Sequence, residues 1–225
     1  MFIGKSSEAW RDEQREKAVI DSLKEIMPVH YRYFAFLDVG KIRDRSCLAI
    51  CREVHDRKID MKTCELVYLR PLKLGVSYID QAAGVRDLLD NELFELWPLT
   101  FMIDAGGPGE VLADVCQRMG MKPMRTIITG GNESTMKNGR LKVPRNVLFQ
   151  TLMKYLIRPD FRIAGDLPFF DELQAELVML TPGYGNNGAF YINSGAHDDL
   201  AISVAGAVFG YARHGRSRQG VTTLY

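Results

Sequence analysis

Three short stretches of the sequence place aspartates at the ends of apolar runs. The run Tyr-Phe-Ala-Phe-Leu leads to Asp38 and the run Thr-Phe-Met-Ile leads to Asp104, and a glycine follows each aspartate after one residue. The adjacent Asp198 and Asp199 precede the apolar run Leu-Ala-Ile-Ser-Val-Ala. A single Asp-x-Gly is also common in turns, but a carboxylate beside a buried strand is costly unless something satisfies it. Because the pattern recurs, we interpret these carboxylates as parts of one shared site.

Clustered carboxylates raise each other's pKa unless a cation neutralises them. Their hard oxygen atoms suit Mg²⁺ or Mn²⁺, and two such ions about 4 Å apart can promote hydrolysis of a phosphodiester. Asp198 and Asp199 would point about 100° apart within a regular helix, but the first residue of a helix need not be helical, so both could be ligands. Either could instead cap the helix. The preceding His197 could orient water or phosphate, or have only a structural role. The set predicts metal-dependent cleavage of nucleic acid.

Periodicity and turn residues predict the elements that must position these side chains. Short connections among the first three strands predict an antiparallel meander, and a later strand, tight turn and helix predict a parallel part of the sheet. We expect strands at residues 32–38, 46–54, 64–70, 99–103, 124–129, 161–164 and 189–192. We expect helices at residues 6–26, 78–96, 110–119, 144–155, 168–180 and 197–212. A projecting hairpin is expected at 130–144, and a loop or hairpin tip at 181–188. This order describes an α/β fold with an RNase H-like mixed sheet and helices on both faces. Its first and fourth strands are neighbours, which would place Asp38 beside Asp104.

The length of 225 residues and a hydrophobic content of 46% fit one medium domain with a sizeable core. We expect an amphipathic helix or linker at residues 1–30, the domain at 31–212 and a basic flexible tail at 213–225. The four cysteines form no CxxC pair and have no histidine at zinc spacing. We expect Cys47 and Cys51 to be small core residues. No apolar run reaches the roughly 18 residues of a membrane span, and we expect no signal peptide, no membrane partner and a cytoplasmic location.

The formal net charge of +1 does not by itself show whether the protein binds nucleic acid. The charged residues are, however, unevenly distributed along the chain. Between residues 122 and 145 the chain has several lysines and arginines and one acidic residue, Glu133. This segment is predicted to guide DNA beside the site, since basic side chains bind phosphates without sequence specificity. The alternative is a solvated surface loop. The candidate DNA-binding residues are Lys137, Arg140, Lys142 and Arg145.

Taken in order, four motifs resemble the nuclease domain of the large terminase subunit of tailed bacteriophages. They are Phe-Leu-Asp38-Val-Gly, Met-Ile-Asp104-Ala-Gly-Gly-Pro-Gly, Leu-Lys-Val-Pro ahead of a helix, and His-Asp198-Asp199-Leu, and the resemblance covers residues 31–211. It implies an RNase H-like endonuclease that cuts concatemeric double-stranded viral DNA during packaging, inside the bacterial host. It also implies Asp38, Asp104, Asp198 and Asp199 as ligands of two Mg²⁺ or Mn²⁺ ions. The implied partners are the packaging ATPase domain, the small terminase and the portal.

The sequence departs from a full large terminase because it has no G-x-x-x-x-G-K-[ST] motif and no room for a packaging ATPase domain. It is therefore interpreted as an excised nuclease domain or a stand-alone phage or prophage relative. A Holliday-junction resolvase or another nuclease of this fold is one alternative. Two alternatives come from other classes: a lobe of an actin-like or sugar-kinase ATPase, which normally needs a second lobe, and a catalytically inactive DNA-binding prophage module.

Overall fold

The computed structural model describes residues 7–40, 44–184, 190–194 and 198–218. Its centre is a mixed sheet with the strand order β6-β7-β5-β4-β1-β2-β3-β8. β1, β2 and β3 form the expected antiparallel meander, and β4, β5 and β7 continue the sheet in parallel beyond β1. The strands are β1 (Val29–Asp38), β2 (Cys47–Asp56), β3 (Met61–Pro71), β4 (Leu99–Asp104), β5 (Met124–Thr129), β6 (Thr135–Lys137), β7 (Arg140–Pro144) and β8 (Phe161–Ile163). The predicted α/β class and RNase H-like mixed sheet are confirmed.

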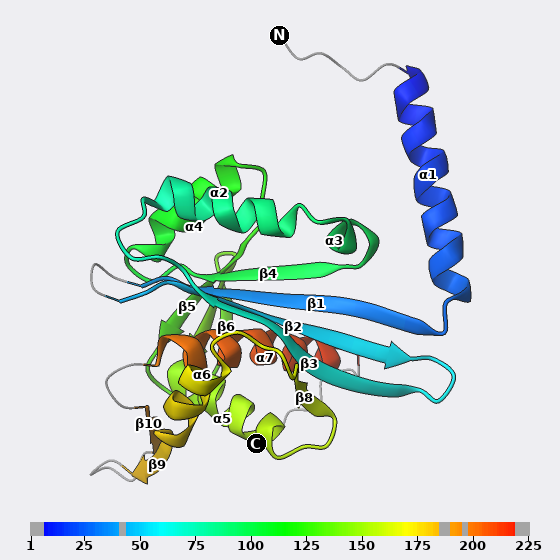
Figure 1. The fold of residues 1–225 in the computed structure, drawn as a ribbon. Coiled ribbons are helices and arrows are strands. Elements are labelled where there is room, and N and C mark those ends of the chain that lie inside the picture. Colours follow the sequence, from blue (N-terminus) through cyan, green and yellow to red (C-terminus); the bar gives the residue numbers. More distant parts are fainter. Residues whose placement is uncertain (1–6, 41–43, 185–189, 195–197, 219–225) are drawn as a thin grey trace.

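Helices cover both faces of this sheet (Figure 1). One face carries α2 (Tyr78–Leu89), α3 (Glu92–Leu96) and α4 (Gly109–Arg118), and the other carries α5 (Arg145–Leu156), α6 (Phe170–Val178) and α7 (Asp199–Arg218). The first helix, α1 (Ser7–Ile26), extends away from the sheet near the start of β1. A separate two-stranded ladder pairs β9 (Thr181–Tyr184) with β10 (Phe190–Asn193).

The central strand β1 supplies side chains to both layers of the core. Phe34 and Phe36 point into the layer under α7, whereas Ala35 and Leu37 point into the layer under α2 and α4. This alternation follows from the two-residue period of a strand. α7 can lie close to β1 because a Cβ atom at Gly206 would come within 2.2 Å of the Phe36 ring. α7 is therefore held against the face of the sheet at β1.

The structure differs from the sequence predictions at several element boundaries. The helix expected at 78–96 is divided into α2 and α3, because the Asn91 side chain accepts a hydrogen bond from the Leu93 N–H (3.0 Å) and starts a new helix. α7 continues to Arg218 instead of ending at Ala212, since no proline interrupts the chain there. Residues 219–225 of the expected tail lie outside the described residues. The short strand β8 joins the sheet as a parallel edge strand beside β3.

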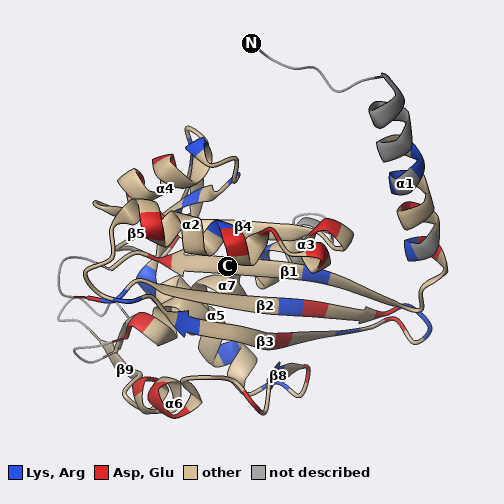
Figure 2. Ribbon diagram, turned by 45° about the horizontal axis from the view of Figure 1, so that its top comes forward, with Lys and Arg blue, Asp and Glu red and all other residues tan. Residues whose placement is uncertain are grey.

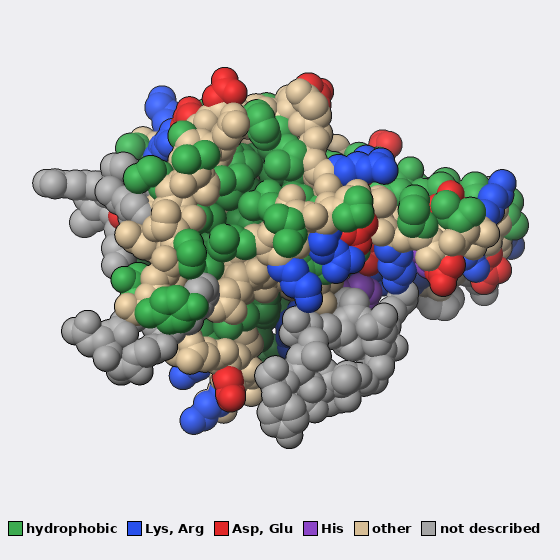
Figure 3. Space-filling model, turned by 90° about the horizontal axis from the view of Figure 1, so that it is seen from below, with side chains coloured by type: hydrophobic (Ala, Val, Ile, Leu, Met, Phe, Trp, Pro, Cys, Tyr) green, Lys and Arg blue, Asp and Glu red, His purple; other side chains and the backbone are tan. Residues whose placement is uncertain are grey.

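The surface carries charges of both signs on the helices and strands (Figure 2). Hydrophobic side chains gather on the face seen from below the sheet (Figure 3). The exposed hydrophobic residues of the molecule include Ile157, Val178 and Tyr184. Cys47 and Cys51 are buried, as expected for core residues. Within the described part of the chain, no helix has both the length and the apolar character that are needed to cross a membrane.

Candidate active site

Three of the predicted aspartates meet at one edge of the sheet. β1 and β4 are parallel neighbours in which Leu37 pairs with Ile103, so Asp38 and Asp104 follow at the same edge. α7 packs on β1 and β2 and begins there with Asp199. Burial, followed by the negative charges of Asp104 and Asp199, raises the pKa of Asp38 to about 8. The Asp38 carboxyl therefore holds a proton near neutral pH when no metal ion lies beside it.

The donor set of this cluster fits a hard divalent cation by its chemistry. Carboxylate oxygens are the preferred ligands of Mg²⁺ and Mn²⁺. Burial and the neighbouring carboxylates disfavour the ionised form of Asp38, which a bound cation would stabilise. However, no three His, Cys, Asp or Glu side chains among the described residues are arranged closely enough to hold a metal ion as they stand. The carboxylates thus interact through their charges, and coordination of one ion would require them to move closer together.

The turn after Asp104 shows why glycines follow this residue. Asp104 Oδ1 accepts a hydrogen bond from the Gly106 N–H at 3.0 Å, which fixes the carboxylate at the end of β4. A Cβ atom at Gly109 would lie 1.8 Å from the Asp104 carbonyl oxygen. The first turn of α4 can therefore approach the end of β4 only because position 109 has no side chain.

Asp198 has a different environment from Asp199. Its carboxylate forms an ion pair with Nη2 of Arg145, the first residue of α5. The same Nη2 donates a hydrogen bond to Ser194 Oγ at 2.9 Å. The Arg145 guanidinium is also close enough to Asp38 for its charge to lower the pKa of that carboxyl, against the effect of burial. Arg145 thus begins the helix that the sequence predicted at 144–155, and it lies beside the acidic cluster. His197 lies outside the described residues.

Glu176 is a site residue that the sequence analysis missed. Its Oε2 accepts a hydrogen bond from the Ala201 N–H (2.8 Å), in the first turn of α7. Burial raises the pKa of Glu176, and the nearby charge of Asp199 raises it further. Glu176 therefore caps the helix that presents Asp199. A glutamate on the amphipathic helix α6 carries no sequence signal for this role, which depends entirely on a contact between distant elements.

The predicted DNA-binding residues fall into two groups. Lys137 and Lys142 are exposed on the hairpin of β6 and β7, whose turn contains Asn138 and Gly139, both with positive φ (51° and 71°). Such a turn is typical of a tight two-residue hairpin. The structure places Arg140 in contact with α4, as described next, and Arg145 beside the acidic cluster.

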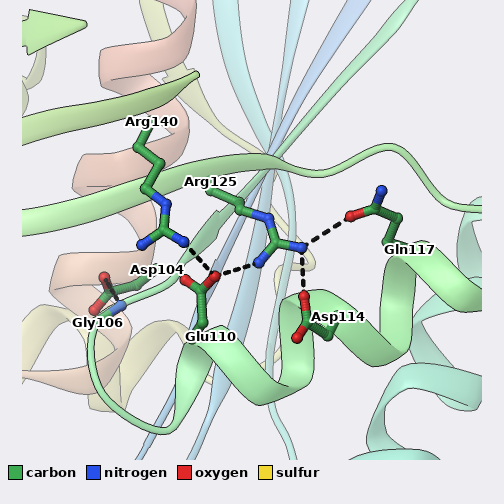
Figure 4. Close-up of polar contacts among 7 residues, drawn as sticks. All are labelled: Asp104, Gly106, Glu110, Asp114, Gln117, Arg125 and Arg140. Atoms are coloured by element: carbon green, nitrogen blue, oxygen red, sulfur yellow. Dashed lines mark hydrogen bonds and ion pairs between the residues drawn. The ribbon is translucent and has the colours of Figure 1, made fainter. Parts of the chain in front are cut away.

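Arg140 connects the hairpin to α4 through a shared carboxylate (Figure 4). Glu110 Oε1 accepts hydrogen bonds from Arg140 Nη2 (2.7 Å) and from Arg125 Nη1 (2.6 Å). Arg125 in turn binds Asp114 (2.6 Å) and Gln117 (2.8 Å) through Nη2. Glu110 lies in the first turn of α4, close behind the Asp104 turn. This network fixes the start of β7, directly after the hairpin turn, against the first turn of α4.

Comparison with known proteins identifies the fold. No family model matches the sequence, and a search of curated proteins finds no match. Among solved structures, the large terminase nuclease of thermophilic phage G20c with bound magnesium is 18% identical, with a TM-score of 0.51 over 80% of this chain and 81% of that one. Its cobalt-bound form is 17% identical, with a TM-score of 0.51 over the same shares.

A second similar structure comes from a different virus. The human cytomegalovirus terminase nuclease domain, soaked with manganese and bound to an inhibitor, is 10% identical, with a TM-score of 0.50 over 85% of this chain and 92% of that one. At these identities the likeness concerns the fold alone. The chain has the fold of large terminase nuclease domains.

Proposed function

We propose that this chain is a nuclease of the large terminase type, which hydrolyses phosphodiesters of double-stranded DNA with the help of divalent metal ions. The observation that carries the proposal is the meeting of Asp38, Asp104 and Asp199 at one sheet edge, in the fold of the terminase nuclease domains. Each of these carboxylates raises the cost of ionising its neighbours, and burial adds to that cost at Asp38. A structural role for all three would be expensive.

The residues that would hold two Mg²⁺ or Mn²⁺ ions are Asp38, Asp104 and Asp199. Bound there, the ions would supply Lewis-acid stabilisation of the charge that develops on the phosphate. In the overall reaction the oxygen of a water molecule bonds to phosphorus, one P–O ester bond breaks, and a proton passes to the leaving oxygen. The products are one phosphomonoester end and one hydroxyl end. The carboxylates of this chain would position the reacting phosphate, and the glycine turn after Asp104 fixes that carboxylate at the end of β4.

The proposed DNA contact uses the exposed lysines of the hairpin. Lys137 is on the edge strand β6 and Lys142 is on its neighbour β7. Only β5 lies between β7 and β4, the strand that ends at Asp104. Phosphate contacts of this kind give affinity without sequence preference and weaken with salt. A role in cutting concatemeric viral DNA, in a bacterial host and together with a packaging ATPase, a small terminase and a portal, extends the proposal and rests on the likeness to terminase nucleases.

The test is incubation of the purified chain with supercoiled plasmid and Mn²⁺ or Mg²⁺. We expect relaxation and linearisation that EDTA prevents and that Asp38→Asn and Asp104→Asn abolish without loss of the fold. Either variant cutting at an undiminished rate would contradict the site assignment. Comparison of linear duplex with a four-way junction separates the terminase proposal from a Holliday-junction resolvase, since the resolvase would prefer the junction. An intact plasmid with folded wild-type protein and every metal would favour the ATPase or inactive-module alternatives.

A further inference from the structure

We propose that the adjacent Asp198 and Asp199 have different roles, and that Arg145 is a further catalytic residue. Asp199 belongs to the metal-binding carboxylates, whereas Asp198 holds the Arg145 guanidinium in position to contact the phosphate that is cleaved. The inference rests on the proposed nuclease function and deepens it, because it assigns a phosphate-contacting group within the same site.

The position of Arg145 is fixed from several sides. It follows β7 directly and begins α5, with Pro144 as the residue before the helix. Nη2 contacts the Asp198 carboxylate and Ser194 Oγ, and Ser194 itself is buried. The guanidinium carbon lies 5.1 Å from the centre of the Phe149 ring, in a cation–π arrangement. A side chain restrained in this way loses little entropy when it binds a ligand.

Arg145 nevertheless remains accessible to a ligand. Its side chain is 41% exposed, whereas that of Asp198 is only 15% exposed. Among the described residues both polar partners of Arg145 are bound by Nη2, and a guanidinium has five N–H donors in a planar fork. A phosphate oxygen can therefore be bound by this group while the contacts to Asp198 and Ser194 persist. Arginine is well suited to this role because its fork matches the geometry of a phosphate.

The charges of the cluster support the division of roles between the two aspartates. Consecutive residues at a helix start point in different directions, about 100° apart in a regular helix. The charge of Asp199 acts on Asp38, whereas the carboxylate of Asp198 meets Arg145. A carboxylate already paired with a guanidinium is a poor additional metal ligand. A positive group beside the carboxylates instead complements the negative charge that develops on a phosphate during hydrolysis.

A purely structural role is the competing explanation, since Arg145 also connects α5 to the segment that precedes α7. Arg158 provides a matched control just beyond the opposite end of α5. Its side chain is also 41% exposed, it forms an ion pair with Asp160, and its guanidinium carbon lies 4.9 Å from the centre of the Tyr155 ring. Arg158→Gln therefore removes an ion pair and a cation–π contact of the same kind as those of Arg145, but at a place far from the acidic cluster.

The experiment measures two properties of the same purified chains: Mn²⁺ affinity by calorimetry, and the single-turnover rate of plasmid cleavage with protein in excess over saturated DNA. Asp199→Asn should weaken Mn²⁺ binding at least about tenfold, because it removes a charged ligand, whereas Asp198→Asn and Arg145→Gln should weaken it much less. Arg145→Gln should lower the single-turnover rate about 100-fold, a usual effect of removing one group that stabilises transition-state charge. Arg145→Lys should restore part of the rate, and Arg158→Gln should match the wild type in both measurements.

Two results would overturn the inference while leaving the nuclease proposal in place. One is loss of Mn²⁺ binding in Asp198→Asn to the same degree as in Asp199→Asn. The other is cleavage by Arg145→Gln within about threefold of the wild-type rate. A folded wild-type chain that neither binds Mn²⁺ nor cuts DNA would instead contradict the proposed function itself.

Discussion

At the scale of single residues, the chemistry of Asp38 comes from its position. The carboxyl is ordinary in type, but burial and the charges of Asp104 and Asp199 raise its pKa to about 8. In the unfolded chain the same group titrates at about 4. Folding therefore favours the protonated form. As the pH rises, the metal-free protein must either keep this proton or bear the cost of a buried negative charge.

This pKa leads to a prediction about stability in EDTA. Because the folded state binds more protons than the unfolded state between about pH 4 and pH 8, the contribution of Asp38 to stability falls as pH rises through that window. We expect the melting temperature of the wild type to decline more steeply than that of Asp38→Asn from pH 5 to pH 8.5. Added Mn²⁺ should reduce the difference, since a cation favours the ionised form. Parallel pH profiles of the two proteins in EDTA would contradict this assignment of the pKa.

The residues of the site differ in how far the sequence could predict them. Asp38 and Asp104 were predictable because each ends an apolar strand and precedes a glycine turn. The different environments of Asp198 and Asp199 were not, because neighbouring positions at a helix start differ only in direction. Arg145 was predicted as a DNA-binding residue at the start of a helix, and that helix is confirmed, but the sequence could not show that the Arg145 side chain meets Asp198.

At the scale of elements, Glu176 connects α6 to the start of α7. Glu176→Ala removes the acceptor of the Ala201 N–H, and loss of such a cap costs about 1 kcal/mol of unfolding free energy. We expect this variant also to cut DNA more slowly, since the first turn of α7 presents Asp199. Glu176→Gln keeps an acceptor oxygen and should retain most of the stability. The measurements are urea unfolding and plasmid cleavage.

Glu172 on the same helix provides the control for Glu176. Its side chain is 51% exposed and pairs with Arg45 at the surface, an interaction that contributes at most about 1 kcal/mol and commonly much less. Glu172→Ala should therefore leave the rate of cleavage unchanged. Equal loss of activity in the two alanine variants would show that the cap of α7 has no special importance.

In the hairpin of β6 and β7, one prediction distinguishes residues that contact DNA from Arg140, which holds the hairpin to α4. Lys137→Ala and Lys142→Ala should each weaken duplex binding and reduce its dependence on salt by about one phosphate contact. Arg140→Ala should lower the melting temperature, because it releases Glu110 from one of its two arginines. Fluorescence anisotropy of a labelled duplex at several KCl concentrations provides the measurement.

The exposed Lys58 provides a matched control for the hairpin lysines. It follows β2 at the end of the sheet opposite Asp38. Lys58→Ala should bind the duplex as the wild type does, with the same salt dependence. If it weakens binding as much as the hairpin variants do, the affinity comes from overall charge and the hairpin does not guide DNA.

At the scale of the whole molecule, the sequence predicted the strand meander, the parallel extension and the position of β1 next to β4. These features follow from local patterns and from short connections, which leave few possible topologies. The division of α2 from α3, the edge position of β8 and the extension of α7 depend on packing and capping between elements. A periodic pattern gives the type of an element well, but gives its ends and neighbours poorly.

The close contact between α7 and β1 is the whole-molecule feature on which the site depends most directly. A Cβ atom at Gly206 would lie 2.2 Å from the Phe36 ring, so Gly206→Ala must push the helix away from the sheet or displace the ring. Overpacking of this kind costs about 1–3 kcal/mol. Because Asp199 starts the displaced helix, we expect both a lower melting temperature and slower DNA cleavage. Phe36→Leu in the same chain should restore part of each loss, since it makes room for the added methyl group.

Gly84 on α2 provides the opposite case, because nothing lies within 4 Å of a Cβ atom at that position. Gly84→Ala should leave cleavage unchanged and raise stability by up to about 1 kcal/mol, as expected for alanine in place of glycine in an exposed helix. If Gly206→Ala instead behaved like Gly84→Ala, then α7 could shift without disturbing the carboxylates. The position of Asp199 would then not depend on how closely the helix packs on β1, and the geometry of the site would have to be set locally, by the Glu176 cap and by the Arg145–Asp198 ion pair.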